Sequence, residues 1–210
     1  MDIDVPHHPI ESRRDFFIHL FTITCGLLIA LSMEGCVEWM HHRALVHEAR
    51  TNIRRELADN RKATEEDIQN IQKDEAGFEQ NLKAERRLRD GPKNVHNSVG
   101  ASFIWSATSD AAWRTARDTG ALAYMPYAEI QRYADVYGQQ EITNAVAVQL
   151  FRQQTEAIAP LFTEEDPSTL TKDEFARLLH DSAMVYLDLR TLKQILQQQR
   201  DQYGNVLKAQ

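Results

Sequence analysis

The stretch from Phe16 to Met33 limits what this chain can fold into more than any other feature of the sequence. Its eighteen residues carry no formal charge, and a helix needs about 20 apolar residues to cross the hydrocarbon core of a bilayer. Glu34 and Glu38 mark where the lipid must end, and Trp39 has the amphipathic ring that favours a membrane interface. A buried core helix is the alternative, but nothing else in the chain is apolar enough to enclose it. The sequence therefore predicts one membrane-spanning helix.

Basic residues on both sides of the span bear on its orientation. Arg13 and Arg14 adjoin its N-terminal end, and four arginines follow on the other side: Arg43, Arg50, Arg54 and Arg55. Basic flanks favour the cytoplasmic side, and we give more weight to the pair closest to the lipid. We expect a single-pass protein of a bacterial inner membrane, with Arg13, Arg14 and Trp39 at the membrane interfaces. Its parts are a cytoplasmic tail, a transmembrane helix and a periplasmic helical domain, at residues 1–15, 16–39 and 40–210.

Two motifs leave open that the N-terminus is processed. Ser12 to Phe17 resembles a twin-arginine export signal, an address that is usually removed. Met33 to Cys36 stands where a lipoprotein cleavage site would, with Cys36 as the lipidated residue, although Met33 and Glu34 differ from the residues preferred there. No A-x-A cleavage site follows the apolar run. An exported protein with a cleaved or lipidated N-terminus therefore stays an alternative.

Helix-breaking residues are scarce in the rest of the chain, and their positions divide it into helices. There are 8 glycines and 6 prolines, and the abundant Ala, Leu, Gln, Glu and Arg favour helix. The helix that continues the span is expected to end at Asp90 to Pro92. A short helix follows between Ser109, as N-cap, and Gly120, as left-handed C-terminal cap. A third starts at Pro126, and the last starts at the capping box Thr171 to Glu174.

Each long helix carries one stripe of residues at intervals of three and four. In the first helix, where Asn60 and Glu75 interrupt it, the stripe is Val46, Ala49, Ile53, Leu57, Thr64, Ile68, Ile71, Phe78 and Leu82. In the third it is Ile130, Tyr133, Tyr137, Val148, Phe151, Ile158 and Phe162. In the last it is Leu178, Ser182, Val185, Leu189, Leu192, Leu196, Gln199, Tyr203 and Val206. These stripes, with short links between the helices, predict an all-α fold: an up-and-down helical bundle with coiled-coil-like seams.

Three blocks of sequence resemble a bacterial family of single-pass membrane proteins of unknown function. The blocks are Gly26 to Leu31 with Val37 to Trp39, Asn52 to Asn60, and Trp113 to Leu122 with Tyr133 to Tyr137 after it. They are similar to the family's G-x-L-I-A-L membrane helix, its N-I-x-x-E-L-x-x-N pattern and its W-x-x-x-x-x-x-G-A-L stretch. The resemblance covers roughly residues 16–140. It implies a membrane anchor and an extracytoplasmic helical domain, and it supplies no catalytic residues.

One cluster of potential metal ligands lies where the predicted span ends. On a helix Glu34, Glu38 and His41 or His42 share a face, and Glu38-x-x-His41 has the spacing of a di-metal carboxylate helix. That type of site needs a second such motif on a facing helix, which the sequence lacks. We interpret the four residues as a polar belt in contact with lipid headgroups, and a metal or proton-sensing site is the alternative.

Enzyme activity and nucleic-acid binding are not expected. A hydrolase or transferase needs a nucleophile beside a base or a glycine-rich phosphate cradle, and the glycines here are scattered singly. We therefore predict no catalytic residues and no cofactor. The formal net charge of -7 argues against wholesale binding of nucleic acid, which needs a basic face.

Two classes of function stay open. The first is a noncatalytic interaction or scaffold module of the envelope, whose partners are the lipid bilayer and a second copy or another envelope protein. The second is a small-ligand sensor whose pocket is lined by Trp105, Trp113, Tyr124 and Tyr133. A sensor would need a separate signalling partner, because the tail Met1 to Asp15 is too short to form a signalling domain.

Overall fold

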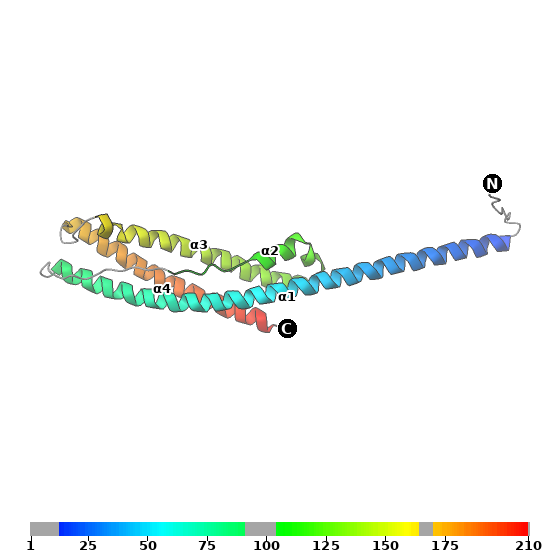
Figure 1. Cartoon of the computed structure of the whole chain (residues 1–210), viewed down its shortest axis with the longest axis horizontal. Coiled ribbons are helices and arrows are strands. Elements are labelled where there is room, and N and C mark those ends of the chain that lie inside the picture. Colours follow the sequence, from blue (N-terminus) through cyan, green and yellow to red (C-terminus); the bar gives the residue numbers. More distant parts are fainter. Residues whose placement is uncertain (1–12, 91–103, 164–169, 210) are drawn as a thin grey trace, which may run out of the picture. The chain divides into compact units, whose positions relative to one another are not determined.

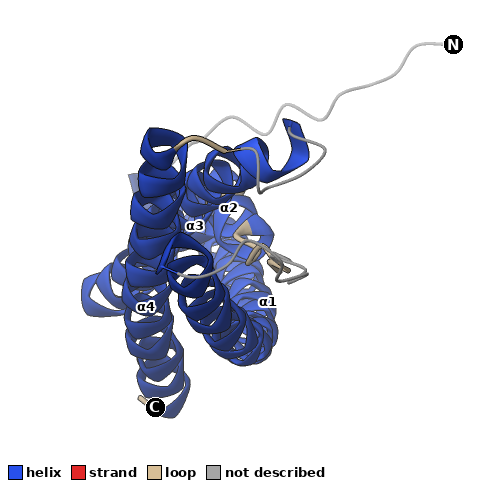
Figure 2. Cartoon of the chain, turned by 90° about the vertical axis from the view of Figure 1, so that its left-hand side faces the viewer, coloured by secondary structure: helices blue, strands red, loops and turns tan. Residues whose placement is uncertain are grey.

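The computed structural model describes residues 13–90, 104–163 and 170–209, and every regular element in them is helical. These elements are four α-helices and one 3-10 helix: α1 Arg13–Asp90, α2 Ala111–Asp118, η1 Ala121–Tyr124, α3 Tyr127–Thr163 and α4 Lys172–Lys208. Figures 1 and 2 show the α-helices. The predicted all-α class is confirmed. The chain divides into two compact units, Met1–Glu48 and Ala49–Gln210.

Most of the predicted helix boundaries are confirmed. Helix α1 ends at Asp90, and Gly120 has the left-handed φ of 75° expected after a short helix. The capping box is present, since Thr171 Oγ1 accepts the N–H of Glu174 and the Glu174 side chain accepts the N–H of Thr171. Pro126 precedes α3 by one residue instead of starting it.

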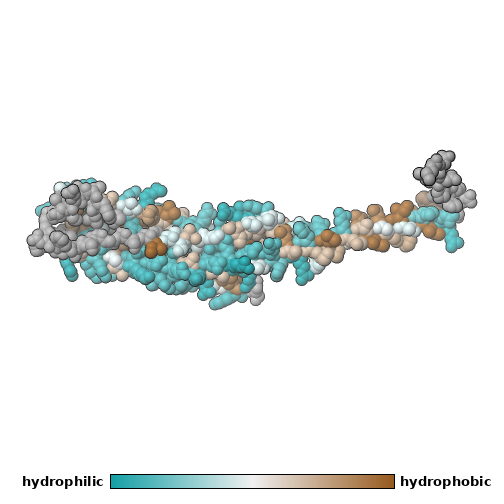
Figure 3. Space-filling view, in the orientation of Figure 1, coloured by the Kyte–Doolittle hydropathy of each residue, from teal (hydrophilic) through white to brown (hydrophobic). Residues whose placement is uncertain are grey.

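In the first unit, the apolar part of α1 has no buried side chain. It is long and apolar enough to cross a membrane, and Figure 3 shows it as a run of brown residues. The hydroxyls of Thr22, Thr24 and Ser32 each donate to the carbonyl four residues earlier, over 2.9, 2.8 and 2.7 Å. Their donor capacity is thus met inside the helix, as hydrocarbon surroundings require.

In the second unit, α1, α3 and α4 lie side by side (Figures 1 and 2) and share one apolar cluster. The α1 stripe predicted from Ala49 onward is buried at every apolar position, and Asn60 within it is buried as well. The α4 stripe is also confirmed, because every predicted member from Leu178 to Tyr203 is buried. Only Val206, at the end of α4, is partly exposed.

The predicted stripe of α3 is wrong in its second half. Val148 and Phe151 are 59% and 56% exposed, while the side chains of Ile158 and Phe162 lie outside the described ones. The buried residues of α3 alternate steps of three and four from Gln140 onward: Tyr133, Val136, Tyr137, Gln140, Thr143, Ala147, Leu150, Gln154 and Ala157. Small and amide side chains occupy most of this face, so the largest apolar residues in the second half of α3 do not mark its buried side.

The directions of the helices differ from a simple up-and-down order. Contacts between α1 and α3 join Arg50 to Glu129 and Asn60 to Gln140, so these two helices run in the same direction. Helix α4 runs in the opposite direction, as shown by its contacts with α1 in the pairs Arg54–Leu207, Glu75–Lys193 and Glu85–Ser182. Parallel α1 and α3 require the chain between them to return along the length of α1.

Candidate functional site

The returning chain lies against α1 as a non-helical segment, residues 104–110, and this contact forms the candidate site. The N–H of Ser106 donates to Asp67 Oδ1 over 2.9 Å, and the N–H of Ser109 donates to Asn60 Oδ1 over 2.8 Å. The three steps from Ser106 to Ser109 cover roughly 10 Å in an extended chain, and the seven steps from Asn60 to Asp67 cover roughly the same distance along a helix. The segment is therefore extended and runs antiparallel to α1, and its backbone bonds to residues on the buried face of that helix.

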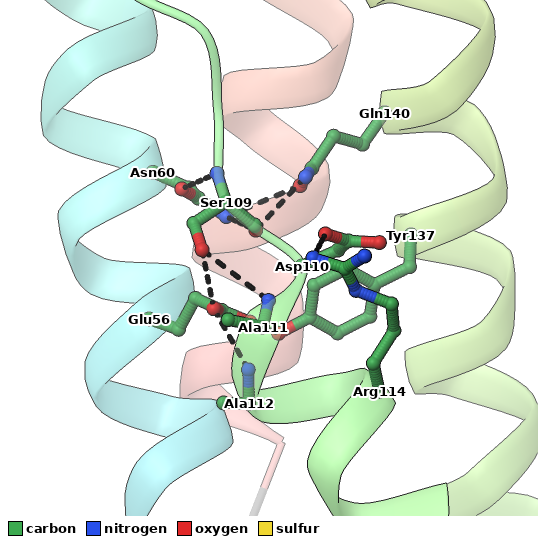
Figure 4. A network of polar contacts seen from close by, with 9 residues as sticks. All are labelled: Glu56, Asn60, Ser109, Asp110, Ala111, Ala112, Arg114, Tyr137 and Gln140. Atoms are coloured by element: carbon green, nitrogen blue, oxygen red, sulfur yellow. Dashed lines mark hydrogen bonds and ion pairs between the residues drawn. The ribbon is translucent and has the colours of Figure 1, made fainter.

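Asn60 binds both the backbone N–H and the backbone carbonyl of Ser109 (Figure 4). Besides accepting the Ser109 N–H, its Nδ2 donates to the Ser109 carbonyl over 2.6 Å. Gln140 of α3 donates to the same carbonyl over 2.9 Å and accepts from Asn60 over 3.1 Å. Two buried amides thus supply the hydrogen bonds that a non-helical backbone lacks among its own neighbours.

Glu56, one turn before Asn60 on α1, holds the start of α2 in the same network (Figure 4). Its Oε2 accepts the hydroxyl of Ser109 over 2.7 Å and the N–H of Ala112 over 2.9 Å, and its Oε1 accepts the hydroxyl of Tyr137 over 2.7 Å. A negative charge at a helix N-terminus is stabilising. Burial and the bond to Glu56 raise the pKa of Tyr137, which keeps it a donor.

The prediction that Ser109 is the N-cap of α2 is therefore wrong. Asp110 occupies the N-cap position, and its side chain makes no capping bond. Ser109 does reach the N–H of Ala111, over 3.3 Å, but Glu56 supplies the stronger capping contact from fifty-six residues before Ala112. No local pattern around residue 110 identifies a cap that comes from another helix.

The network continues from α3 into α4. Gln140 Oε1 also accepts the hydroxyl of Tyr203 over 2.8 Å, and Tyr203 in turn accepts from Gln199. All three side chains are buried, and burial raises the pKa of Tyr203 to about 12. We call Glu56, Asn60, Ser109, Gln140 and Tyr203 the polar clamp, because together they bind α1, α3, α4 and the returning segment to one another.

A bidentate ion pair lies beyond the clamp, at the end of the unit where the chain enters from residue 48. Arg50 Nε and Nη2 donate to the two carboxylate oxygens of Glu129 over 2.8 and 2.7 Å. The bond from Arg50 holds the pKa of Glu129 below its usual value. Arg54, one turn on, donates to the carbonyl of Leu207 over 3.2 Å and so binds the last turn of α4.

The four aromatic residues proposed as a ligand pocket are used mainly for packing. Trp113 lies edge-on to Tyr133, with ring centroids 6.3 Å apart, and stacks on Tyr137 at 5.4 Å. Trp105 instead packs on the apolar cluster shared by the three long helices. Tyr124 is 51% exposed. Of the four residues, the structure thus brings together only Trp113 and Tyr133. Tyr137, which was not predicted to line the pocket, stacks on Trp113 beside them.

The potential metal ligands lie on an exposed part of α1. Glu34, Glu38 and His41 line one shallow hollow, and His42 Nε2 is 3.9 Å from Glu38 Oε1. Among the described residues, no three histidine, cysteine or acidic side chains are grouped closely enough to hold a metal ion. At the predicted interfaces, Arg43 lies over the ring of Trp39 at 5.3 Å, and Arg13 and Arg14 are exposed at the start of α1.

Two buried carboxyl groups belong to the same face of α1 as the clamp. Asp67 is 0% exposed, and burial raises its pKa to about 6 against the effect of the bond from Ser106. Glu85 is 1% exposed, accepts the Ser182 hydroxyl over 3.1 Å, and burial raises its pKa to about 7. One oxygen of each carboxylate has no hydrogen-bond partner among the described residues. Neither residue was predicted to be buried, although each continues the three-and-four spacing of the stripe.

Comparisons with protein-family models, with curated proteins and with solved structures found no match to this chain. Its class therefore rests on the structure itself. In the part of the chain that the structure describes, it is an all-helical protein with one helix, near the N-terminus, that is long and apolar enough to cross a membrane.

Proposed function

We propose that this chain is a membrane-anchored, noncatalytic helical module of the bacterial envelope, and that it binds another envelope component or a second copy of itself. The N-terminal part of α1 is the anchor. The second unit, a helical bundle with coiled-coil-like seams, is held outside the cytoplasm. This agrees with what the resemblance to single-pass membrane proteins implies.

One observation carries the proposal: the uncharged stretch from Phe16 to Met33 has no buried side chain, and it is continuous in α1 with a unit that has its own core. Left in water, that stretch would expose apolar side chains far beyond what a soluble protein tolerates. The polar clamp supports a noncatalytic role, because its donors and acceptors bind the protein's own backbone and helices.

Fractionation of cells that produce the full chain tests the anchor. We expect the protein to stay with membranes after carbonate extraction, and recovery at native length in the soluble fraction would contradict the proposal. An alkaline phosphatase fusion at the C-terminus tests the side: activity is expected, whereas an inactive phosphatase and a fluorescent green-protein fusion would reverse the orientation. The mass of the mature chain distinguishes an intact N-terminus from a cleaved or lipidated one.

A pH-sensing domain that works with a separate signalling partner is the second candidate. The observation that favours it is the pair Asp67 and Glu85, whose buried carboxyl groups have pKa values raised to about 6 and about 7. Groups that titrate in this range change charge near physiological pH. The Glu85 experiment in the Discussion measures whether this titration is coupled to stability.

A further inference from the structure

The turn between α2 and α3 lies at the end of the second unit where the chain enters from the anchor. Arg50 is the second residue of that unit, and it forms the ion pair with Glu129 in the first turn of α3. Because α1 and α3 run in the same direction, the residues before Glu129 lie on the side from which α1 enters. The turn Ala121 to Tyr127 is therefore at the anchor end of the unit.

This turn has an inner and an outer set of side chains. Ala121 and Met125 are 0% and 7% exposed and fix the turn to the unit. Tyr124 and Tyr127 form the outer set, with 51% and 79% exposed. Tyr127 is thus more exposed than Phe21, which at 71% has the highest value in the uncharged stretch of α1. The two rings therefore give the turn an exposed aromatic surface at the anchor end of the unit.

The covalent chain limits how far the turn can be from the membrane. Eleven residues separate Trp39 from Arg50, and along an unbroken helix they cover about 16 Å. Fully extended, they would reach at most about 40 Å, so this bound holds for every arrangement of the two units. The opposite end of the unit, where Glu85 contacts Ser182, is a further 35 residues along α1, or about 50 Å.

We propose that Tyr124 and Tyr127 contact the headgroup region of the same membrane that α1 crosses, as a second point of attachment. The inference rests on the proposed membrane anchor. Tyrosine suits this region, because its ring is apolar and its hydroxyl requires water or a polar headgroup. A lipid surface is the occupant we infer, since the bilayer is the partner that the covalent chain keeps within reach of this turn.

Depth-dependent fluorescence quenching tests this contact in the full-length protein. In a background with Cys25→Ser and Cys36→Ser, single cysteines are introduced by Tyr127→Cys, Leu187→Cys or Leu28→Cys and labelled with an environment-sensitive dye. Leu187 is 52% exposed on α4 and lies twenty residues, about 30 Å, from Leu207 near the anchor end. Each variant is reconstituted into phosphatidylcholine vesicles with and without nitroxide-labelled lipid; the nitroxide is on the headgroup for positions 127 and 187 and on the acyl chain for position 28, which lies mid-span. Because Tyr127 is exposed and outside the core, its replacement leaves the fold intact.

The expected result is quenching at position 127 and at position 28 by nitroxide lipid, with no quenching at position 187. Equal, low quenching at 127 and 187, together with quenching at 28, would overturn the second contact and leave the anchor standing. Lack of quenching at 28 would instead refute the anchor. A blue-shifted dye at 127 that nitroxide lipid does not quench would assign the turn to a protein partner or a second copy, and would also overturn the proposal.

Discussion

Replacing Glu85 by glutamine should make the protein more stable at alkaline pH. Glu85 is 1% exposed, and its one described hydrogen bond comes from Ser182 over 3.1 Å. Its other oxygen has no partner among the described residues. Glutamine keeps the shape and can still accept the Ser182 hydroxyl, but it removes the buried charge, whose cost a single neutral hydrogen bond does not offset.

The sign and size of the effect follow from the pKa of Glu85. Burial raises it from 4.5 to about 7, so the folded state holds the proton more tightly than the unfolded state does. Stability should therefore fall as pH rises from about 4.5 to about 7 and level off above that. The loss corresponds to about 3 kcal/mol between the two limits. Asp67, with its pKa raised to about 6, should add a loss of the same sign.

Unfolding of the full-length protein in detergent, followed by circular dichroism at about pH 4 and about pH 8, measures this effect. Glu85→Gln should be more stable than the parent protein at the higher pH and should lose less stability between the two. Glu79→Gln is the matched control: Glu79 is exposed on the same helix and bonded to Lys83, which lowers its pKa, so its replacement should bring no gain. If Glu85→Gln unfolds more readily than the parent at the higher pH, the carboxylate is stabilised by a partner and our reasoning fails.

Two further substitutions test the core and the polar clamp. Leu192→Ala removes a side chain that is 0% exposed and should lower the free energy of unfolding by about 2–5 kcal/mol. Gln194→Ala, on the exposed side of α4, should change the melting temperature little. Equal melting temperatures of the two variants would mean that the α4 seam is not core. Asn60→Ala leaves the N–H of Ser109 unpaired and should cost about 1–3 kcal/mol, while the exposed neighbour Asp59→Ala should be neutral. Faster hydrogen exchange at Ser109 in the Asn60 variant alone would locate the loss at the clamp, and unchanged exchange would contradict the role we give it.

Regular patterns with large apolar residues could be predicted from the sequence. The α4 stripe was predicted correctly from Leu178 to Tyr203, including the polar members Ser182 and Gln199, because steps of three and four continue through them. The α1 stripe from Ala49 to Leu82 was predicted for the same reason. In α4 from Leu178 to Tyr203, and in α1 from Ala49 to Leu82, one face is buried at its apolar positions, which is the condition under which periodicity is informative.

The second half of the α3 stripe and the hydrogen bonds of the clamp could not be predicted, for a shared physical reason. The buried face of α3 contains Gln140, whose burial is favourable because other elements satisfy its amide group. Those elements are the returning segment and α4, and their positions depend on the tertiary fold. The capping of α2 by Glu56 depends on the same arrangement, so the composition of residues 104–118 does not reveal it.

Asn60 and Gln199 interrupt apolar stripes, and the structure suggests why such interruptions are useful here. Leu189 and Leu196 are one heptad apart, so a shift of α4 by one heptad, about 10 Å, would replace one leucine by the other at that position with little loss of apolar contact. The same shift would remove Tyr203 from Gln140 and leave buried amides unpaired, at about 1–3 kcal/mol for each group. Buried polar residues set helix register in this way in parallel-helix dimers. We therefore interpret the clamp as the feature that sets the register of α1, α3 and α4, while the leucines supply most of the stability.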